Sequence, residues 1–238
     1  MANSANIVSN PVSAHGTNPQ NLVEKITRLK VYNSRYWKEE CFGLTAETFV
    51  DKAVSLKYYG GSYAGNNKPT PFLCLLLKLL QIQPDKDIVL EFIQNEDFKY
   101  LRLLGAFYVR LICRSEEVYS YLEPLYNDYR KIVFRGPTGF EIRHVDSFMD
   151  SLLHDELVCD IALPHLQSRL KLEELGVFPG PRRSALDEML LLEAEATVNS
   201  VFQDAISSGQ VGAAAGLTGL DGEREVMAAQ EGGRRGQM

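Results

Sequence analysis

The sequence predicts an all-α fold: a compact multi-helix bundle with a small β-hairpin appended near residues 132–144. Two of the expected helices open with a capping side chain followed by proline, at Asn18-Pro19 and at Thr70-Pro71, and this pair is typical of a helix N-terminus. Apolar residues then recur three and four positions apart, which is the spacing of one helix face. Only around the turn at residues 136–139 do apolar residues alternate instead, and this alternation predicts two short strands.

The first two helices follow from these start signals. The second is expected to begin after Thr45 and to end in the glycine-rich loop at residues 60–65. The first is expected to begin at Pro19, and its apolar spacing predicts a buried face made of Leu22, Ile26 and Leu29.

Two later segments are apolar enough to form the centre of the bundle. Eight of the nine residues from Phe72 to Leu80 are apolar, so this helix must be enclosed on most sides. The segment from Asp97 to Ile112 is apolar almost all round, and we place it at the centre. Its expected core positions are Phe98, Leu101, Gly105, Tyr108 and Ile112.

The chain divides into three parts by composition. Residues 1–14 are small and polar and are expected to be disordered, and residues 15–175 form the helical domain. Residues 176–238 carry 5 Lys/Arg against 9 Asp/Glu, a net charge of −4, and hold ten of the 18 glycines. We expect this acidic Gly/Ala-rich tail to be mostly disordered, with a possible helix at 184–206.

Charge and cysteine content exclude several classes of protein. The net charge of −6 argues against a broad electrostatic grip on nucleic-acid phosphates. The four cysteines are far apart and each lies in an apolar segment, which favours reduced core thiols over disulfides. No apolar run approaches the ~20 residues that span a bilayer, so no membrane association is expected.

No pattern in the sequence indicates catalysis or a cofactor. The glycine loop at 60–65 is followed by Asn66-Asn67 and not by the Lys-Ser/Thr pair of a phosphate-binding loop. His144, His154 and His165 have no zinc-site spacing, and no nucleophile elbow is present. We therefore predict no metal, no cofactor and no enzymatic activity.

Two groups of side chains are candidates for binding a partner protein. Lys99, Arg102 and Arg110 share one strip of the central helix; they either receive a partner's carboxylates or pair with acidic residues of neighbouring helices. The second group combines tyrosines with mixed charge, which suits a protein-binding face but would equally tie the hairpin to the bundle. It comprises Tyr121, Glu123, Tyr126, Asp128, Tyr129 and Arg130, and the loop residues Asn66 and Lys68 complete the candidate set.

Several consecutive blocks resemble the pre-mRNA-splicing factor 38 family, over roughly His15 to Leu175. The longest are Tyr36-Trp37-Lys38-Glu39-Glu40-Cys41-Phe42-Gly43-Leu44-Thr45-Ala46-Glu47, Lys68-Pro69-Thr70-Pro71-Phe72-Leu73-Cys74-Leu75, Asn95-Glu96-Asp97-Phe98-Lys99-Tyr100 and Tyr121-Leu122-Glu123-Pro124-Leu125-Tyr126-Asn127-Asp128-Tyr129-Arg130-Lys131.

The resemblance implies a small helical scaffold without enzymatic activity. Members of that family join the spliceosome around the stage at which the tri-snRNP joins, and they are needed for its activation. They act in the nucleus by binding other splicing proteins in extended or helical form, so we expect one copy of this chain within a larger complex. The acidic tail departs from the family pattern, because animal members carry Arg-Ser dipeptides there. Tail contacts to RNA are therefore not expected, and nuclear entry bound to a partner is one route.

Two other functions remain open from the residues alone. The helical body would bind RNA directly if Lys68, Lys99 and Arg102 contact phosphates. An enzyme with an unrecognised site is the third possibility, for which a co-purifying metal or nucleotide would be the sign.

Overall fold

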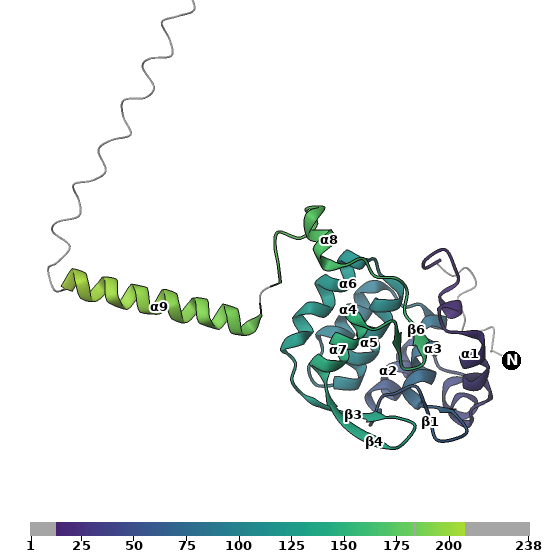
Figure 1. The fold of residues 1–238 in the computed structure, drawn as a ribbon. Coiled ribbons are helices and arrows are strands. Elements are labelled where there is room, and N and C mark those ends of the chain that lie inside the picture. The colour runs from purple at the N-terminus through teal and green to yellow at the C-terminus, as the bar shows by residue number, and fades with distance from the viewer. Residues whose placement is uncertain (1–12, 183, 208–238) are drawn as a thin grey trace, which may run out of the picture. The chain divides into compact units, whose positions relative to one another are not determined.

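The computed structural model describes residues 13–182 and 184–207 (Figure 1). They fall into two units, one within residues 1–181 and one within residues 182–238. The expected disorder of residues 1–14 and of the tail beyond residue 207 thus falls almost entirely outside the described residues. At the start of the described chain, Ala14 is buried and forms a β-bridge with Thr17.

Helix α5 (Lys99–Ile112) lies at the centre of the first unit, as predicted. Every residue from Tyr100 to Leu111 is buried, because the helix contacts α2 (Ala46–Val54), α3 (Pro71–Ile82), α4 (Lys86–Gln94), α6 (Ser115–Leu122) and α7 (Val145–His154). One expected core position is wrong. Phe98 precedes the first turn of the helix and its side chain is 40% exposed.

Gly105 allows α4 to approach α5 closely. A Cβ atom at this position would lie 3.0 Å from Cγ1 of Ile93 and 3.3 Å from the carbonyl oxygen of Val89. Both distances are shorter than an ordinary carbon contact, so a side chain here would push α4 away from the core.

Helix α3 begins where the sequence predicts. The hydroxyl of Thr70 accepts a hydrogen bond from the backbone N–H of Leu73 (3.2 Å) and donates one to the carbonyl of Gly60 (2.6 Å). The helix ends at Ile82, and the next residue, Gln83, has the left-handed conformation typical of a helix C-terminus. Between these ends the residues from Phe72 to Gln81 are all buried.

The first helix differs from the prediction. Pro19–Leu22 form only a short 3₁₀ turn (η2), the chain is extended at Val23, and helix α1 then begins at Lys25 and ends at Asn33. This break resets the phase of the helix, so that Thr27 and Val31 are its buried residues. Ile26 and Leu29 are 66% and 51% exposed and do not belong to the buried face.

The predicted hairpin is present. Strands β3 (Lys131–Arg135) and β4 (Phe140–His144) are antiparallel, with Val133 opposite Ile142. On the other side of β3, Tyr59 exchanges two backbone hydrogen bonds with it: its N–H donates to Val133 (2.9 Å), and its carbonyl accepts from Arg135 (2.8 Å). The hairpin is thereby joined to the chain that follows α2.

Shorter elements complete the first unit. Trp37 is 3% exposed and packs edge-on against Tyr32. Two small antiparallel pairs were not foreseen from the sequence. The elements are the π-helical turn η3 (Trp37–Cys41), β1 (Ser62–Tyr63), β2 (Lys68–Pro69), the 3₁₀ turn η4 (Glu123–Asn127), β5 (Leu157–Val158), β6 (Ile161–Ala162) and α8 (Arg169–Glu174).

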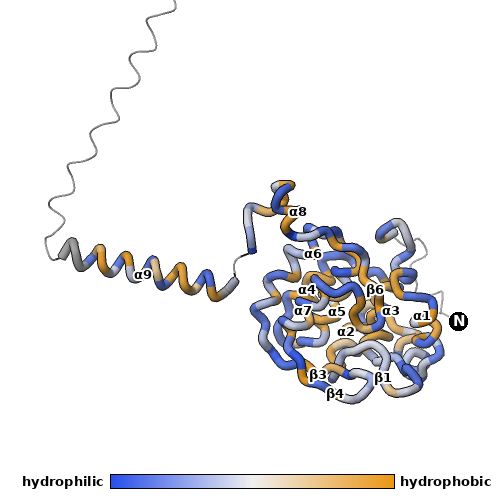
Figure 2. The backbone as a smooth tube through the Cα atoms, in the orientation of Figure 1, coloured by the Kyte–Doolittle hydropathy of each residue, from blue (hydrophilic) through white to orange (hydrophobic). Residues whose placement is uncertain are grey.

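The second unit contains helix α9 (Ala185–Ser207), in the segment where a helix was expected. Apolar and polar residues alternate along its length (Figure 2). Its large apolar side chains are exposed, among them Leu186, Leu190, Val201 and Phe202.

Candidate functional site

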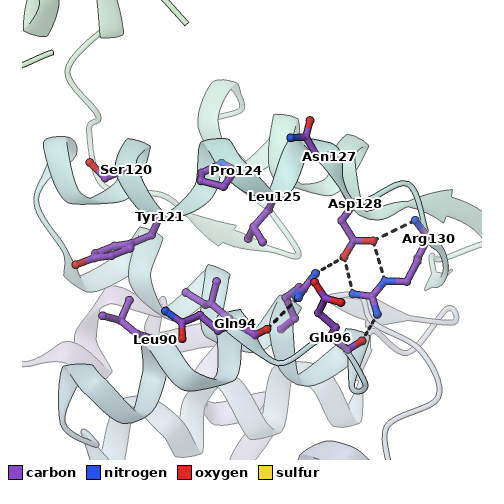
Figure 3. A pocket seen from close by; sticks show the side chains of 12 residues that line it. Leu90, Gln94, Glu96, Ser120, Tyr121, Pro124, Leu125, Asn127, Asp128 and Arg130 are labelled. Carbon is purple, nitrogen blue, oxygen red and sulfur yellow. Dashed lines mark hydrogen bonds and ion pairs between the residues drawn. The ribbon is translucent and has the colours of Figure 1, made fainter. Parts of the chain in front are cut away.

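A groove of about 600 Å³ lies between helix α4 and the segment formed by α6 and η4. Figure 3 shows Tyr121, Pro124 and Leu125 on one side of the groove and Leu90 on the other. Pro124 ends α6 and turns the chain into η4. The apolar part of the groove therefore arises where a helix is interrupted by proline opposite the exposed edge of α4.

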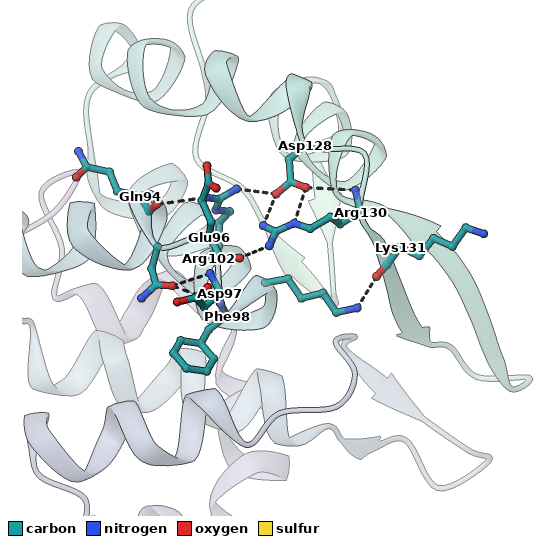
Figure 4. A network of polar contacts seen from close by, with 10 residues as sticks. Gln94, Glu96, Asp97, Phe98, Arg102, Asp128, Arg130 and Lys131 are labelled. Atoms are coloured by element: carbon teal, nitrogen blue, oxygen red, sulfur yellow. Dashed lines mark hydrogen bonds and ion pairs between the residues drawn. The ribbon is translucent and has the colours of Figure 1, made fainter.

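The polar end of the groove is built around one carboxylate and two guanidinium groups (Figure 4). Asp128 accepts hydrogen bonds from Nη1 of Arg102 (2.7 Å) and from Nε (2.8 Å) and Nη2 (2.5 Å) of Arg130. One further donor of each arginine reaches a backbone carbonyl: Nη2 of Arg102 donates to Gln94, the last residue of α4 (3.3 Å), and Nη1 of Arg130 donates to Glu96 in the loop that follows.

This network fixes the charge of Asp128. Burial alone would raise the pKa of its carboxyl, but the hydrogen bonds from Arg130 and Arg102 outweigh that effect and lower the pKa to about 2. With Glu96 also lining the groove, the two guanidinium charges are matched by two carboxylates. Nε of Arg102 is buried and has no hydrogen-bond partner within residues 13–182 and 184–207, so one donor beside the groove is left unsatisfied.

The predicted tyrosine-rich set is divided by the structure. Tyr121, Asp128 and Arg130 line the groove, and Nζ of Lys86 lies 5.2 Å from the ring centre of Tyr121. Tyr129 is 64% exposed and does not line the groove.

The other two members of that set are held within the fold. The hydroxyl of Tyr126 donates to Asp150 of α7 (3.0 Å), and Glu123 forms an ion pair with Arg169 of α8. The side chain of Glu123 is only 16% exposed. Both interpretations of the tyrosine segment thus have support, from different residues: part of it faces the groove, and part ties neighbouring elements together.

The cations of the central helix lie in three different environments. Arg102 forms an ion pair with Asp128, which agrees with the alternative that these cations pair with acidic residues within the fold. Arg110 is buried and donates to the carbonyl of Leu152 (2.7 Å), and Lys99 donates to the carbonyl of Lys131 (2.6 Å). Only Arg102 lines the groove, so the strip does not form one surface that receives carboxylates.

Asn66 and Lys68 belong to another part of the surface. Both line a second depression, near α1 and the β1–β2 turn, which shares no residue with the groove. Of the three cations considered for an RNA site, Lys68 lines this depression, Arg102 lines the groove and Lys99 lines neither.

Sequence reasoning missed the apolar and amide residues of the groove. Their contribution depends on how α4 packs beside η4, which no local pattern encodes. The proline within an otherwise helical stretch was the one available signal. The missed residues are Leu90, Ile93, Gln94, Glu96, Ser120, Pro124, Leu125 and Asn127.

The described cysteines are not set up as nucleophiles. Burial raises the pKa of Cys74 to about 12 and that of Cys113 to about 11, so both stay protonated near neutral pH. Among the residues that the structure describes, no group of three or more His, Cys, Asp or Glu side chains is placed to hold a metal ion. No helix in the same part of the chain is both long and apolar enough to cross a membrane.

Comparison with known proteins gives a consistent result. A family model described as the PRP38 family matches residues 12–176. Pre-mRNA-splicing factor 38A of Danio rerio is 65% identical over 179 residues, which are 75% of this chain and 57% of the relative. The Homo sapiens protein of that name is 64% identical over 177 residues, or 74% of this chain and 56% of the relative. The chain therefore spans little more than half the length of these curated relatives.

A solved structure resembles the fold. It is a chain of the crystal structure of the Snu23-Prp38-MFAP1(217-258) complex of Chaetomium thermophilum, with a TM-score of 0.71 and 39% sequence identity. The match covers 79% of this chain and 100% of that chain.

Proposed function

The chain belongs to the PRP38 family, and from this premise we propose that it is a non-catalytic, protein-binding scaffold of the spliceosome. In this role it acts in the nucleus as a single copy, associates with the tri-snRNP and is required for spliceosome activation. One observation carries the proposal. The solved chain with the same fold and 39% identity assembles with Snu23 and with residues 217–258 of MFAP1, so counterparts of these two proteins are the first partners to test.

The groove supports a docking role for a helical or extended segment of such a partner. Its apolar side offers Tyr121, Pro124 and Leu125 to one or two apolar side chains, while its polar end offers fixed hydrogen-bonding groups. Peptide grooves in proteins combine these two parts, since the apolar part contributes most of the affinity and the polar part sets register. The charges of Arg102 and Arg130 are balanced by those of Asp128 and Glu96, so the partner segment need not carry a net charge at this end.

A pull-down from nuclear extract tests the proposal. The tagged full chain, incubated with nuclease-treated extract, should recover Snu23, MFAP1 and proteins of the tri-snRNP. Tyr121→Ala should reduce this recovery strongly, because truncating a tyrosine at an interface hot spot costs about 2 kcal/mol or more of binding free energy. Tyr129→Ala is the matched control, since Tyr129 belongs to the same segment but lies outside the groove.

Thermal unfolding and partner recovery together separate the role of the groove from the scaffold role. Tyr121→Ala and Tyr129→Ala should unfold at the same temperature as the unmodified chain, so that any loss of binding cannot be a loss of folding. If Tyr121→Ala and Ser120→Arg, two changes at the groove, leave recovery intact, the partner binds elsewhere on the surface. If the unmodified chain recovers no spliceosomal protein, the scaffold role itself is wrong.

A further inference from the structure

The second depression, of about 560 Å³, has a different chemical character from the groove. It lies between the C-terminal half of α1 with the residues that follow it and the β1–β2 turn. Three of its lining residues are cations, Lys30, Arg35 and Lys68, and none of its lining residues carries a carboxylate. In a chain with a net charge of −6, such a cavity is a local exception to the overall charge.

The cations of this depression are available to a ligand. Within the part of the chain that the structure describes, neither Lys30 nor Lys68 forms an ion pair. Arg35 pairs with Glu39 at 2.8 Å, but the two side chains are 87% and 55% exposed. An ion pair this exposed contributes little and is readily exchanged for another anion.

Aromatic rings and side-chain amides are placed among these cations. Tyr36 and Tyr63 line the depression, and the guanidinium of Arg135 lies 5.1 Å from the ring centre of Tyr63. Three amides also line the depression, those of Asn33, Asn66 and Asn67. Tyrosine rings stack on bases of any identity, and amides both donate to and accept from base edges.

We infer that this depression binds a short segment of single-stranded RNA. Lys30 and Lys68 contact successive phosphates, and a base lies against Tyr36 or Tyr63 with its edge toward the asparagines. A phosphorylated peptide is the less suitable ligand. Phosphopeptide sites rely on clustered arginines with bidentate geometry, whereas the unpaired cations here are lysines, and the two aromatic rings would have no base to stack on.

Fluorescence anisotropy with a labelled twelve-nucleotide oligouridine tests this inference on the full chain. Affinity should fall with salt, with a slope of about −1.4 in log K against log salt, since each phosphate contact on a single strand contributes about −0.7. The same relation makes each phosphate contact contribute about 5-fold in affinity at 0.1 M salt relative to about 1 M salt. The variant Lys30→Ala/Lys68→Ala loses two contacts and should therefore bind about 25-fold more weakly at 0.1 M salt. The matched control is Lys25→Ala, which removes an exposed lysine of α1 outside the depression.

The contribution of the bases is tested separately. Tyr63→Leu should weaken oligouridine by about 5-fold or more, while leaving the binding of inorganic polyphosphate unchanged. Thermal unfolding of every variant should match that of the unmodified chain.

Three outcomes would overturn the inference: no binding to oligouridine at 20 mM salt, equal binding by the double lysine variant, or tighter binding of a phosphoserine peptide than of oligouridine. None of them would affect the proposed protein scaffold, because the groove and the depression share no residue.

Discussion

Asp128 is expected to be among the most sensitive polar positions of the fold. Its side chain is 7% exposed and joins Arg102, which is 8% exposed, to Arg130. Asp128→Ala leaves the guanidinium of Arg102 buried, with the carbonyl of Gln94 at 3.3 Å as its one remaining protein partner in the described residues. Removing one member of a buried ion pair typically costs about 3–5 kcal/mol, and we expect a loss in this range.

The pH dependence of stability gives a second measure of the same network. The pKa of Asp128 is about 2 in the folded chain, against an ordinary value of 3.8. A carboxyl whose pKa is lowered by folding stabilises the fold above its unfolded pKa, and this stabilisation is lost as pH falls through the folded pKa. About two pKa units correspond to about 2–3 kcal/mol, fully present above pH ~5 and lost between pH ~4 and pH ~2.

Urea unfolding followed by circular dichroism measures both effects. The unmodified chain and Asp128→Asn should differ by about 2–3 kcal/mol at pH 7 and converge at pH 2, because asparagine keeps the shape of the side chain without its charge. Asp155→Ala removes an exposed aspartate and is the control. A loss below about 1 kcal/mol for Asp128→Ala at pH 7, or a constant difference between Asp128→Asn and the unmodified chain across pH, would refute the assigned role of this carboxylate.

Two further substitutions test the packing of the core helices. Thr70→Val keeps the shape of the side chain but removes its hydrogen bonds to Gly60 and Leu73 at the start of α3. We expect the free energy of unfolding in urea to fall by about 1–2 kcal/mol, and an unchanged midpoint would contradict the role of Thr70 as a helix cap. Gly105→Ala places a methyl group 3.0 Å from Ile93 and should cost about 1–3 kcal/mol; a stabilised variant would show instead that α4 has room to move.

Much of the fold follows from local patterns in the sequence. The central position of α5 was predictable because its apolar residues surround the helix, and the start of α3 because Thr70 and Pro71 are a strong local signal. The hairpin was predictable because alternation on both sides of a Gly-Pro-Thr-Gly turn fits no helix face. In each case the deciding information lies within a few residues along the chain.

The incorrect or missing predictions share a physical cause: they concern features that depend on how distant parts of the chain pack together. Ile26 and Leu29 have correct helical spacing, but the extended residue at Val23 changes where the helix begins and therefore which face is buried. The strip of Lys99, Arg102 and Arg110 was correct as a pattern, yet each cation meets a different neighbour across the bundle. The groove escaped prediction because its walls come from elements whose packing no local motif determines.

The placement of Arg102 connects binding to folding in a way that sequence spacing does not reveal. Its backbone belongs to the central helix, while its side chain reaches Asp128 and the carbonyl of Gln94 at the polar end of the groove. That end is therefore attached to the core, whereas the apolar end at Tyr121 is partly exposed. Substitutions at Arg102 or Asp128 change stability and binding together, so only the apolar end can report on partner binding alone. A rigid polar end also limits the entropy lost on docking, because its side chains are already ordered before the partner arrives.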